Sequence, residues 1–219
     1  MKTQKLSDLE ALLLLAQRVA TDTVSVADVA YVVGQTAANA PSVLLRASML
    51  YHDGVVSRIA IQRGGEGFGY FGFNNSRQIL FANNVPWDNI VPMDIQPRFE
   101  AAKQVNTLTE MISLVTFVQS YKWKSLILVA PHFHQLRVLF SAVTALDQAY
   151  PELRVVSCAG VPLMWDEEVA HSQGTTFGTR SEIFVGEVKR ILSYQQGGKP
   201  FPLVTAHRAL EYIEQRDRR

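Results

Sequence analysis

Short apolar runs alternate along the chain with longer segments in which apolar and polar residues recur at helical spacing. The runs Val29–Val33 and Ser125–Ala130 are apolar without alternation, as in strands that are covered on both faces. The second run is the clearest, so we expect it in the interior of a sheet. Five strands are predicted in all, over Val29–Val33, Arg58–Gln62, Asn89–Val91, Ser125–Ala130 and Arg154–Ser157.

The amphipathic segments between these runs predict helices. In Lys5–Ala20, apolar residues recur every three or four positions, and Ser7 is a suitable N-cap. Residues Gly160–Thr179 mix proline, tryptophan, glycine and charge, and we interpret them as an inserted loop; a break is expected at Gln195–Pro200. The predicted helices are Lys5–Ala20, Pro41–Tyr51, Asn75–Asn84, Leu108–Tyr121, His134–Gln148, Arg180–Tyr194 and Thr205–Gln215.

Strands that alternate with helices are typical of an open, mostly parallel sheet with helices on both faces. The fold class that we predict is therefore α/β, with about five strands. No internal repeat, low-complexity tract or linker divides the chain, so we expect a single domain over residues 1–219. Its core spans residues 28–157, with an N-terminal helix before it and a helical extension after it.

The composition is that of a globular protein, with 47% hydrophobic and 19% charged residues. A net charge of +1 gives no electrostatic footprint for nucleic acid or for an anionic membrane. The apolar run Ala11–Ala16 is far shorter than the roughly 20 residues that cross a bilayer, and the acidic Asp8 and Glu10 before it are unlike a signal peptide. We therefore expect a cytoplasmic protein whose partners include neither nucleic acid nor a membrane.

Ligands of an open parallel sheet bind beyond the carboxyl ends of its strands, near the point where the strand order reverses. We expect Asn106, His132, His134 and Arg137 to converge on this rim. The loops that begin at the predicted strand ends are Gly34–Thr36, Arg63–Glu66, Asp94–Thr107, Pro131–His134 and Cys158–Gly160.

His134 and Arg137 are the most informative pair on the rim. They lie three residues apart at the start of a predicted helix, so both can face one ligand, and the helix N-terminus adds free N–H donors. This arrangement suits a phosphate, a carboxylate or a nucleotide-like group held by Arg137, with His134 as acid or base near neutral pH. We expect Arg137→Ala to weaken ligand binding while leaving folding nearly unchanged. The alternative is that both residues only cap and solvate a surface turn.

Other rim residues have structural as well as functional interpretations. Thr107 and Glu110 have the spacing of a helix capping box, which is the interpretation that we favour for them. Asn106 either presents its amide to a ligand or shapes a turn. Gly64 and Gly65 either let the backbone approach a ligand closely or adopt a positive φ in a turn.

The segment Gly67–Gly72 has the letters of a dinucleotide-binding fingerprint, G-x-G-x-x-G. Residues Arg63–Glu66 separate it from the preceding strand, whereas the first glycine of the fingerprint should close the strand directly. Aromatic residues also crowd the turn. We therefore interpret the segment as a flexible or lid-forming aromatic loop.

The histidines and the single cysteine give little support for a metal site. His132 and His134 have a spacing that permits two metal ligands, with Glu110 or His171 as a third, but nothing in the sequence fixes the third ligand. The single cysteine, Cys158, excludes a multi-cysteine site and an intrachain disulfide, and we interpret it as a small buried apolar residue. We therefore expect no bound metal.

Several motifs together are similar to those of a known family. An opening block resembles R-x-x-x-A/L-Y, G, I-x-x-x-G-G, and a later block resembles L-V-T-x-x-F/Y-H-x-x-R. By these motifs the chain resembles the YdcF-like group that includes SanA and ElyC, over residues 28–157. The matching segments are Leu45–Tyr51, Gly54, Ile59–Ile61, Gly64–Gly65, Val85–Ile90, Asn106–Thr107 and Leu128–Arg137.

The resemblance implies a Rossmann-like fold. It also implies S-adenosylmethionine as a cofactor in one branch of the group and a cell-envelope role in its membrane-anchored branches. Position at the strand ends and the resemblance together favour a functional role for the rim. The predicted catalytic residue is His134, and the predicted ligand-binding residues are Gly34, Gly64, Gly65, Asn106, Thr107, His132 and Arg137.

We therefore expect a protein that binds a small anionic molecule, such as a nucleotide-bearing one, at the carboxyl edge of its sheet. The sequence leaves open whether the protein transforms this molecule. The alternative is a noncatalytic regulatory or interaction module that retains the fold.

Overall fold

A five-stranded parallel sheet forms the centre of the protein, so the predicted α/β fold class is confirmed. The computed structural model describes residues 6–64, 69–103, 105–171, 175–197 and 200–218. The strand order is β3-β2-β1-β4-β5, and β4 lies in the interior, as its apolar run predicts. The strands are β1 (Val29–Val32), β2 (Ile59–Gln62), β3 (Ile90–Met93), β4 (Ser125–Ala130) and β5 (Arg154–Ala159).

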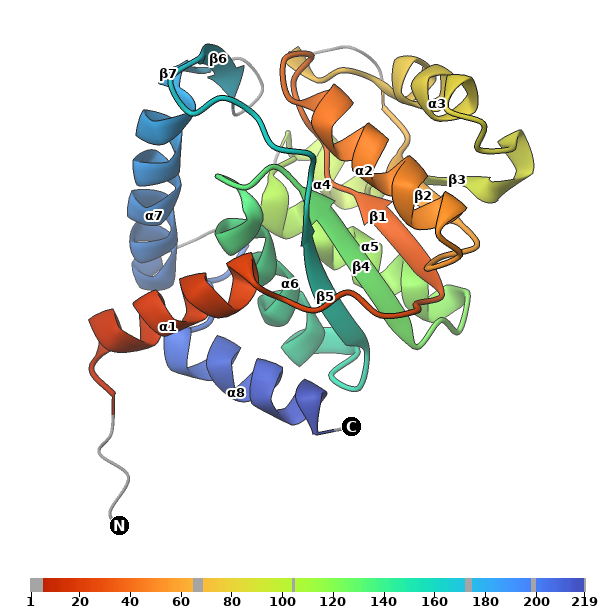
Figure 1. The fold of residues 1–219 in the computed structure, drawn as a ribbon. Helices are drawn as coiled ribbons and strands as arrows, with labels where there is room; N and C mark the ends of the chain where they lie inside the picture. Colours follow the sequence, from red (N-terminus) through yellow and green to blue (C-terminus); the bar gives the residue numbers. More distant parts are fainter. Residues whose placement is uncertain (1–5, 65–68, 104, 172–174, 198–199, 219) are drawn as a thin grey trace.

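Helices cover both faces of this sheet. In Figure 1, α2 lies in front of the sheet and the fainter α5 lies behind it. Helices α2 and α3 contact β1 to β4 on one face, whereas α1, α5 and α6 contact β3, β4 and β5 on the other. The helices are α1 (Asp8–Ala20), α2 (Ala40–His52), α3 (Phe73–Ala82), α4 (Pro97–Ala101), α5 (Thr107–Ser120), α6 (Gln135–Ala149), α7 (Arg180–Gly197) and α8 (Ala206–Asp217), with a short 3-10 turn at Trp87–Asn89.

Strand β1 shows why both faces are covered. Its side chains alternate between two apolar cores: Val29 and Tyr31 lie in one core, and Ala30 and Val32 lie in the other. Consecutive side chains of a strand point to opposite faces, and all four are buried. A strand with two buried faces needs a helical layer on each side, which the continuous apolar run predicts.

Helix ends agree with several sequence signals and depart from others. Ser7 caps α1 as predicted, and it forms a capping box with Glu10. Thr205 caps α8, so this helix begins one residue later than predicted. Helix α7 continues through Gln195 to Gly197, which contradicts the predicted start of a break at Gln195.

Two segments that the sequence presents as loops contain regular structure. Helix α4 lies within the loop that precedes Asn106. Within Gly160–Thr179, β6 (Glu168–His171) and β7 (Thr176–Thr179) form a separate antiparallel hairpin. Each strand has only four residues, and Val169 is the single apolar residue in them that is buried. Such short segments do not show the alternation of apolar and polar residues by which a strand is predicted.

The hairpin and the beginning of α7 lie near the carboxyl ends of the strands, whereas α1 and α8 pack together on another side of the molecule (Figure 1). A buried ion pair fastens α8 to the segment after α1, because Arg216 donates to both carboxylate oxygens of Asp22 at 2.7 Å. Among the residues described, no helix is both long enough and apolar enough to cross a membrane.

Candidate functional site

A buried polar cluster lies where the strand order reverses. Strand β1 is followed by α2 and then by β2 on one side, whereas β4 lies on its other side, so the loops after β1 and β4 diverge at this point. Such a divergence is the usual ligand site of an open α/β sheet. The loop after β1 contributes Gln35, and the loop after β4 contributes His134.

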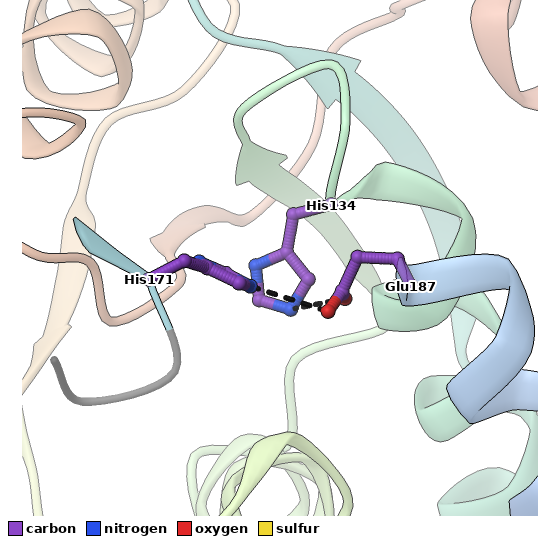
Figure 2. A group of neighbouring side chains, drawn as sticks. All are labelled: His134, His171 and Glu187. Carbon is purple, nitrogen blue, oxygen red and sulfur yellow. Dashed lines mark hydrogen bonds and ion pairs between the residues drawn. The ribbon is translucent and has the colours of Figure 1, made fainter. Parts of the chain in front are cut away.

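Glu187 is the centre of the cluster. This residue of α7 is 1% exposed. Figure 2 shows its carboxylate facing the imidazoles of His134 and His171, which come from the start of α6 and from β6. The Nε2 atoms of these histidines lie 3.7 and 3.3 Å from the carboxylate oxygens. Arg137 donates from Nε to one oxygen, and Arg190 donates from Nη1 to the other at 3.0 Å.

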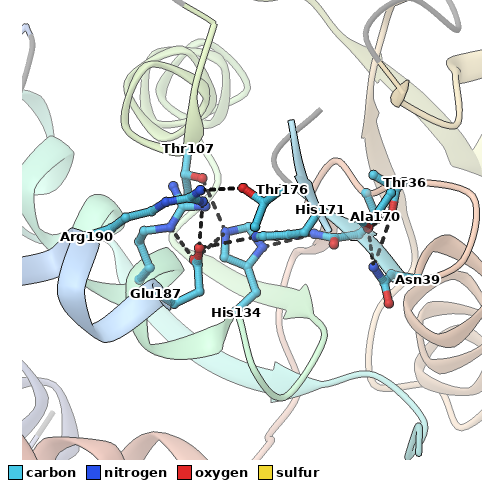
Figure 3. Close-up of polar contacts among 11 residues, drawn as sticks. Thr36, Asn39, Thr107, His134, Ala170, His171, Thr176, Glu187 and Arg190 are labelled. Carbon is cyan, nitrogen blue, oxygen red and sulfur yellow. Dashed lines mark hydrogen bonds and ion pairs between the residues drawn. The ribbon is translucent and has the colours of Figure 1, made fainter. Parts of the chain in front are cut away.

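The hairpin aligns these groups. His171 and Thr176 are paired across β6 and β7, and Thr176 accepts a hydrogen bond of 2.8 Å from Arg190, which also reaches Glu187 (Figure 3). Phe133, Val169 and Ile183 form a small apolar cluster that joins the loop after β4 to the hairpin and α7. The hairpin thus completes the site from a segment that lies outside the central sheet.

Arg180 anchors the start of α7 to the loop after β1. Its side chain is almost fully buried. It donates to Asn39 Oδ1 at 3.1 Å and to the carboxylate of Glu167 at 2.6 Å. Thr36 of the same loop donates to the backbone carbonyl of Ala170 at 2.8 Å (Figure 3). These bonds fix the position of the hairpin over the carboxyl edge.

His134 occupies the N-cap position of α6, which has no side-chain cap. The Gln35 amide nitrogen lies 3.1 Å from Nδ1, and Thr107 Oγ1 lies 3.3 Å from Nε2. With the amide in this orientation, Nδ1 accepts a hydrogen bond and the ring proton is on Nε2. Burial and then the charge of Arg137 lower the pKa of His134 well below its ordinary value, so the imidazole is neutral.

The two buried carboxyl groups near the switch point have opposite electrostatic environments. Burial alone would raise the pKa of Glu187, but Arg137 and the two histidines hold it well below the ordinary range. Burial raises the pKa of Glu110, although Glu110 accepts hydrogen bonds from the Tyr31 hydroxyl at 2.7 Å and from the Gly34 N–H at 2.9 Å. Glu187 is therefore the permanent negative charge of the cluster.

The lowered pKa of His134 predicts a loss of stability in mild acid. The unfolded chain has a histidine pKa of about 6.5, so below that pH the unfolded state binds a proton that the native state does not bind. We expect the free energy of unfolding to fall by about 1 kcal/mol between about pH 7 and pH 5.5, and this part of the loss should be missing from His134→Gln. Chemical denaturation at each pH measures both. If the free energy of unfolding fell equally with pH in the wild type and in His134→Gln, the lowered pKa of His134 would be contradicted.

The structure brings together some of the predicted site residues. Of the four side chains expected to converge on the rim, His134 and Arg137 lie in one cluster, and Thr107, a predicted ligand-binding residue, joins them. Arg137, however, is buried and ion-paired with Glu187, so we expect Arg137→Ala to destabilise the fold, in contrast to the prediction from the sequence that folding is nearly unchanged.

Asn106 shapes the start of α5. Its side-chain oxygen accepts hydrogen bonds from the N–H groups of Leu108 and Thr109, at 2.9 and 3.1 Å. In return, the Asn106 N–H donates to the Thr109 hydroxyl. The capping box therefore begins one residue earlier than predicted, with Asn106 and Thr109 in place of Thr107 and Glu110. The shift frees Glu110 to face β1.

His132 does not join His134. The residue lies at the surface, and the partial desolvation of its imidazole, followed by the nearby charge of Arg46, lowers its pKa. The side chains at these two alternate positions diverge, so His132 and His134 do not form the metal site that the sequence suggests as an alternative.

The predicted glycines have different environments. A Cβ atom at Gly34 would lie 2.7 Å from the ring of Tyr70, so the close packing of Tyr70 on this loop needs glycine. Gly64 accepts a backbone hydrogen bond of 2.9 Å from Phe73 and does not have a positive φ. Gly65 lies outside the described residues. Tyr70 belongs to the described part of the aromatic loop and packs over the end of β1, whereas Gly67 and Phe68 lie outside the described residues.

Sequence reasoning missed Glu187 and Arg190. One signal was present: Ile183, Glu187 and Ile191 are spaced by four residues, and all three are buried. A glutamate within an apolar helical stripe is rarely buried unless it is paired, so this position predicts a buried cationic partner. The sequence does not reveal which partner, because Arg137 is 50 residues away.

Comparisons with known proteins add no relative. No family model and no curated protein matches the chain. The similarity to the YdcF-like group consequently stays a prediction from the motifs, and the site has to be interpreted from its own geometry.

Proposed function

We propose that this protein binds a small anionic molecule at the carboxyl edge of its sheet, with Arg137 as the principal anion ligand. The buried position of Arg137, at the switch point and in the first turn of α6, supports this proposal. The motif resemblance separately implies S-adenosylmethionine, whose carboxylate is a group that Arg137 can bind. The proposal extends to an enzyme that transforms the bound anion with His134 as the acid or base.

The guanidinium group of Arg137 is the observation that carries the proposal. Its side chain is 8% exposed, and its Nε donates to Glu187. Within the part of the chain that the structure describes, neither Nη amine has a hydrogen-bond partner. Neither Nη atom is among the buried side-chain atoms that lack a partner, so both are accessible. A phosphate or carboxylate accepts two parallel bonds from a guanidinium group, and an anion can therefore bind both amines.

The charges around Arg137 favour the binding of an anion. Arg137 and Arg190 contribute two positive charges to a cluster whose ion-paired carboxylate is Glu187, which leaves one positive charge in excess. Helix α6 begins here without a side-chain cap, so the N–H groups of its first turn and its positive dipole end also face the site. A negative ligand is therefore favoured over a neutral one.

A small cleft lies beside the cluster and has room for about one water molecule. Gly34, Gln35, Tyr70 and Phe71 line it, together with apolar side chains of β1, β2 and α2. Gln35 links the cleft to the cluster, because its amide contacts His134. The cleft is too small for an aromatic ring, so the anionic group is the part of a ligand that the site supports.

Arg137→Lys tests the binding proposal. Lysine keeps a positive charge for Glu187 but lacks the planar pair of donors, so we expect the affinity for phosphate-bearing probes to fall by roughly 1.5 kcal/mol, or about tenfold. Inorganic phosphate and AMP, together with S-adenosylmethionine as a probe that has a carboxylate and no phosphate, are screened by the rise in Tm that each produces. Isothermal titration calorimetry then gives the affinity of each probe that binds.

Arg63→Gln is the matched control. Arg63 follows β2 at the same edge, but its side chain is 58% exposed and it pairs with Asp94. Its removal should leave probe affinity unchanged. The proposal is rejected if none of the probes raises the Tm of the wild-type protein, or if Arg137→Lys binds as tightly as the wild type.

A noncatalytic module is the second candidate, and one observation favours it. Both nitrogens of His134 have partners in the structure, and Nε of Arg137 is committed to Glu187. A cluster whose groups satisfy one another also serves to hold α7 and the hairpin on the sheet. Binding of a probe without its conversion would support this candidate.

A further inference from the structure

Three metal-ligating side chains meet beside Arg137. One ligand atom each from His134, His171 and Glu187 lies within 4.8 Å of the other two, and all three residues are buried. They come from the start of α6, from β6 and from α7, so only the folded chain brings them together (Figure 2). The acid–base role proposed for His134 does not use His171.

The spacing of these atoms resembles that of ligands around one ion. The two histidine Nε2 atoms lie 3.7 and 3.3 Å from the oxygens of Glu187, and the longer separation exceeds a hydrogen bond. Two ligands of one tetrahedral zinc ion, each about 2.0 to 2.1 Å from the metal, lie about 3.3 Å apart. The three side chains therefore need little movement to share an ion.

Gln35 provides the outer contact that such a site needs. A histidine that binds a metal through Nε2 carries its proton on Nδ1 and donates it to an acceptor. Gln35 lies at Nδ1 of His134, and its Oε1 is buried and has no hydrogen-bond partner among the described residues. Rotation of the amide by half a turn places Oε1 at Nδ1. The oxygen then accepts the Nδ1 proton, as the outer contact of a metal-bound histidine requires.

Arg137 and Arg190 also bind Glu187, and their charges oppose a further cation. A carboxylate offers about four lone-pair sites, so oxygens that accept from guanidinium groups keep lone pairs for an ion. The positive charge of the loaded site is reduced when an anion takes the fourth position, which zinc sites with three protein ligands leave open. The unpartnered Nη amines of Arg137 can bind the same anion.

We propose that His134, His171 and Glu187 bind a divalent transition-metal ion, zinc in the first place, whose open position receives the anion. Two imidazoles and one carboxylate are a donor set for zinc and its neighbours and not for magnesium or calcium. The inference deepens the proposed function, on which the identity of the fourth ligand rests. Metal and anion should bind cooperatively, because each reduces the charge that opposes the other.

The test titrates chelator-treated, full-length protein with zinc chloride by calorimetry, with and without inorganic phosphate. We expect one zinc ion per chain and tighter zinc binding when phosphate is present. Cobalt chloride should give the visible absorption of a tetrahedral site. His171→Ala should bind zinc at least about tenfold more weakly, since loss of an outer contact alone has an effect of that size.

The controls separate this inference from the proposed function. His132→Ala removes an exposed histidine from the same loop and should leave zinc binding unchanged. Arg137→Lys should lose affinity for phosphate while keeping the zinc site. Absence of stoichiometric zinc binding, absence of the cobalt spectrum, or equal zinc affinity of wild type and His171→Ala each overturns the metal site. The first two need no variant, so misfolding of His171→Ala would not rescue it.

Discussion

Replacing Glu187 with alanine is expected to lower the free energy of unfolding of the metal-free protein by about 3 to 5 kcal/mol. The carboxylate is almost inaccessible and is paired with Arg137, whose side chain is 8% exposed. Its removal leaves a guanidinium group buried without a counter-ion, and the desolvation of that charge is then no longer offset. Urea unfolding monitored by circular dichroism measures the difference.

Two further variants identify the cause of this loss. Glu211→Ala removes a carboxylate that is 63% exposed and pairs with Arg208 at 3.8 Å, so its effect should stay below about 1 kcal/mol. Combining Glu187→Leu with Arg137→Met replaces the buried pair with apolar groups and should restore most of the lost stability. A Glu187→Ala protein as stable as the Glu211→Ala protein would show that the cluster does not hold α7 in place.

Replacing His134 with glutamine is expected to lower turnover by about 10²-fold or more for any phosphate-bearing ligand that the wild-type protein converts. The imidazole is neutral, lies within reach of Thr107 and Glu187, and is close enough to Arg137 for the arginine's charge to lower its pKa. Glutamine keeps a polar side chain of similar length but cannot transfer a proton. Binding of the ligand should change only a few fold.

The metal content of the two proteins separates the two roles proposed for His134. If His134 acts through a metal, His134→Gln loses zinc and turnover together. If it acts as an acid or base, turnover falls while the zinc content of the two proteins is equal. Equal turnover by both proteins, or no conversion of any bound probe by the wild type, removes His134 from catalysis and favours the noncatalytic module.

The local pattern of the chain determines most of the central fold. The continuous apolar run Ser125–Ala130 predicts an interior strand, and β4 lies between β1 and β5. Ser7 predicts the start of α1, because its hydroxyl satisfies an orphan N–H group of the first turn. These features follow from the sequence because burial on both faces and capping depend on residues that are neighbours in the chain.

The sequence also determines where a ligand site belongs. Parallel strands joined by helices place the loops after β1 and β4 at one edge, and His134 and Arg137 follow β4 directly. Their mutual proximity is a property of helical spacing. The sequence does not determine which side chains contact His134 and Arg137.

Only the tertiary structure decides the composition of the cluster. Glu187 is 50 residues from Arg137 and reaches it only because Arg180 and the hairpin β6–β7 fasten α7 over the carboxyl edge. The hairpin is held in place mostly by polar and ionic contacts. It therefore needs no continuous apolar face, and its sequence shows no alternating apolar pattern. Charge pairing between distant segments has no local signature, since any acidic residue can pair with any basic one. The sequence therefore determines the sheet and its edge, and long-range packing decides that two histidines, a glutamate and two arginines share it.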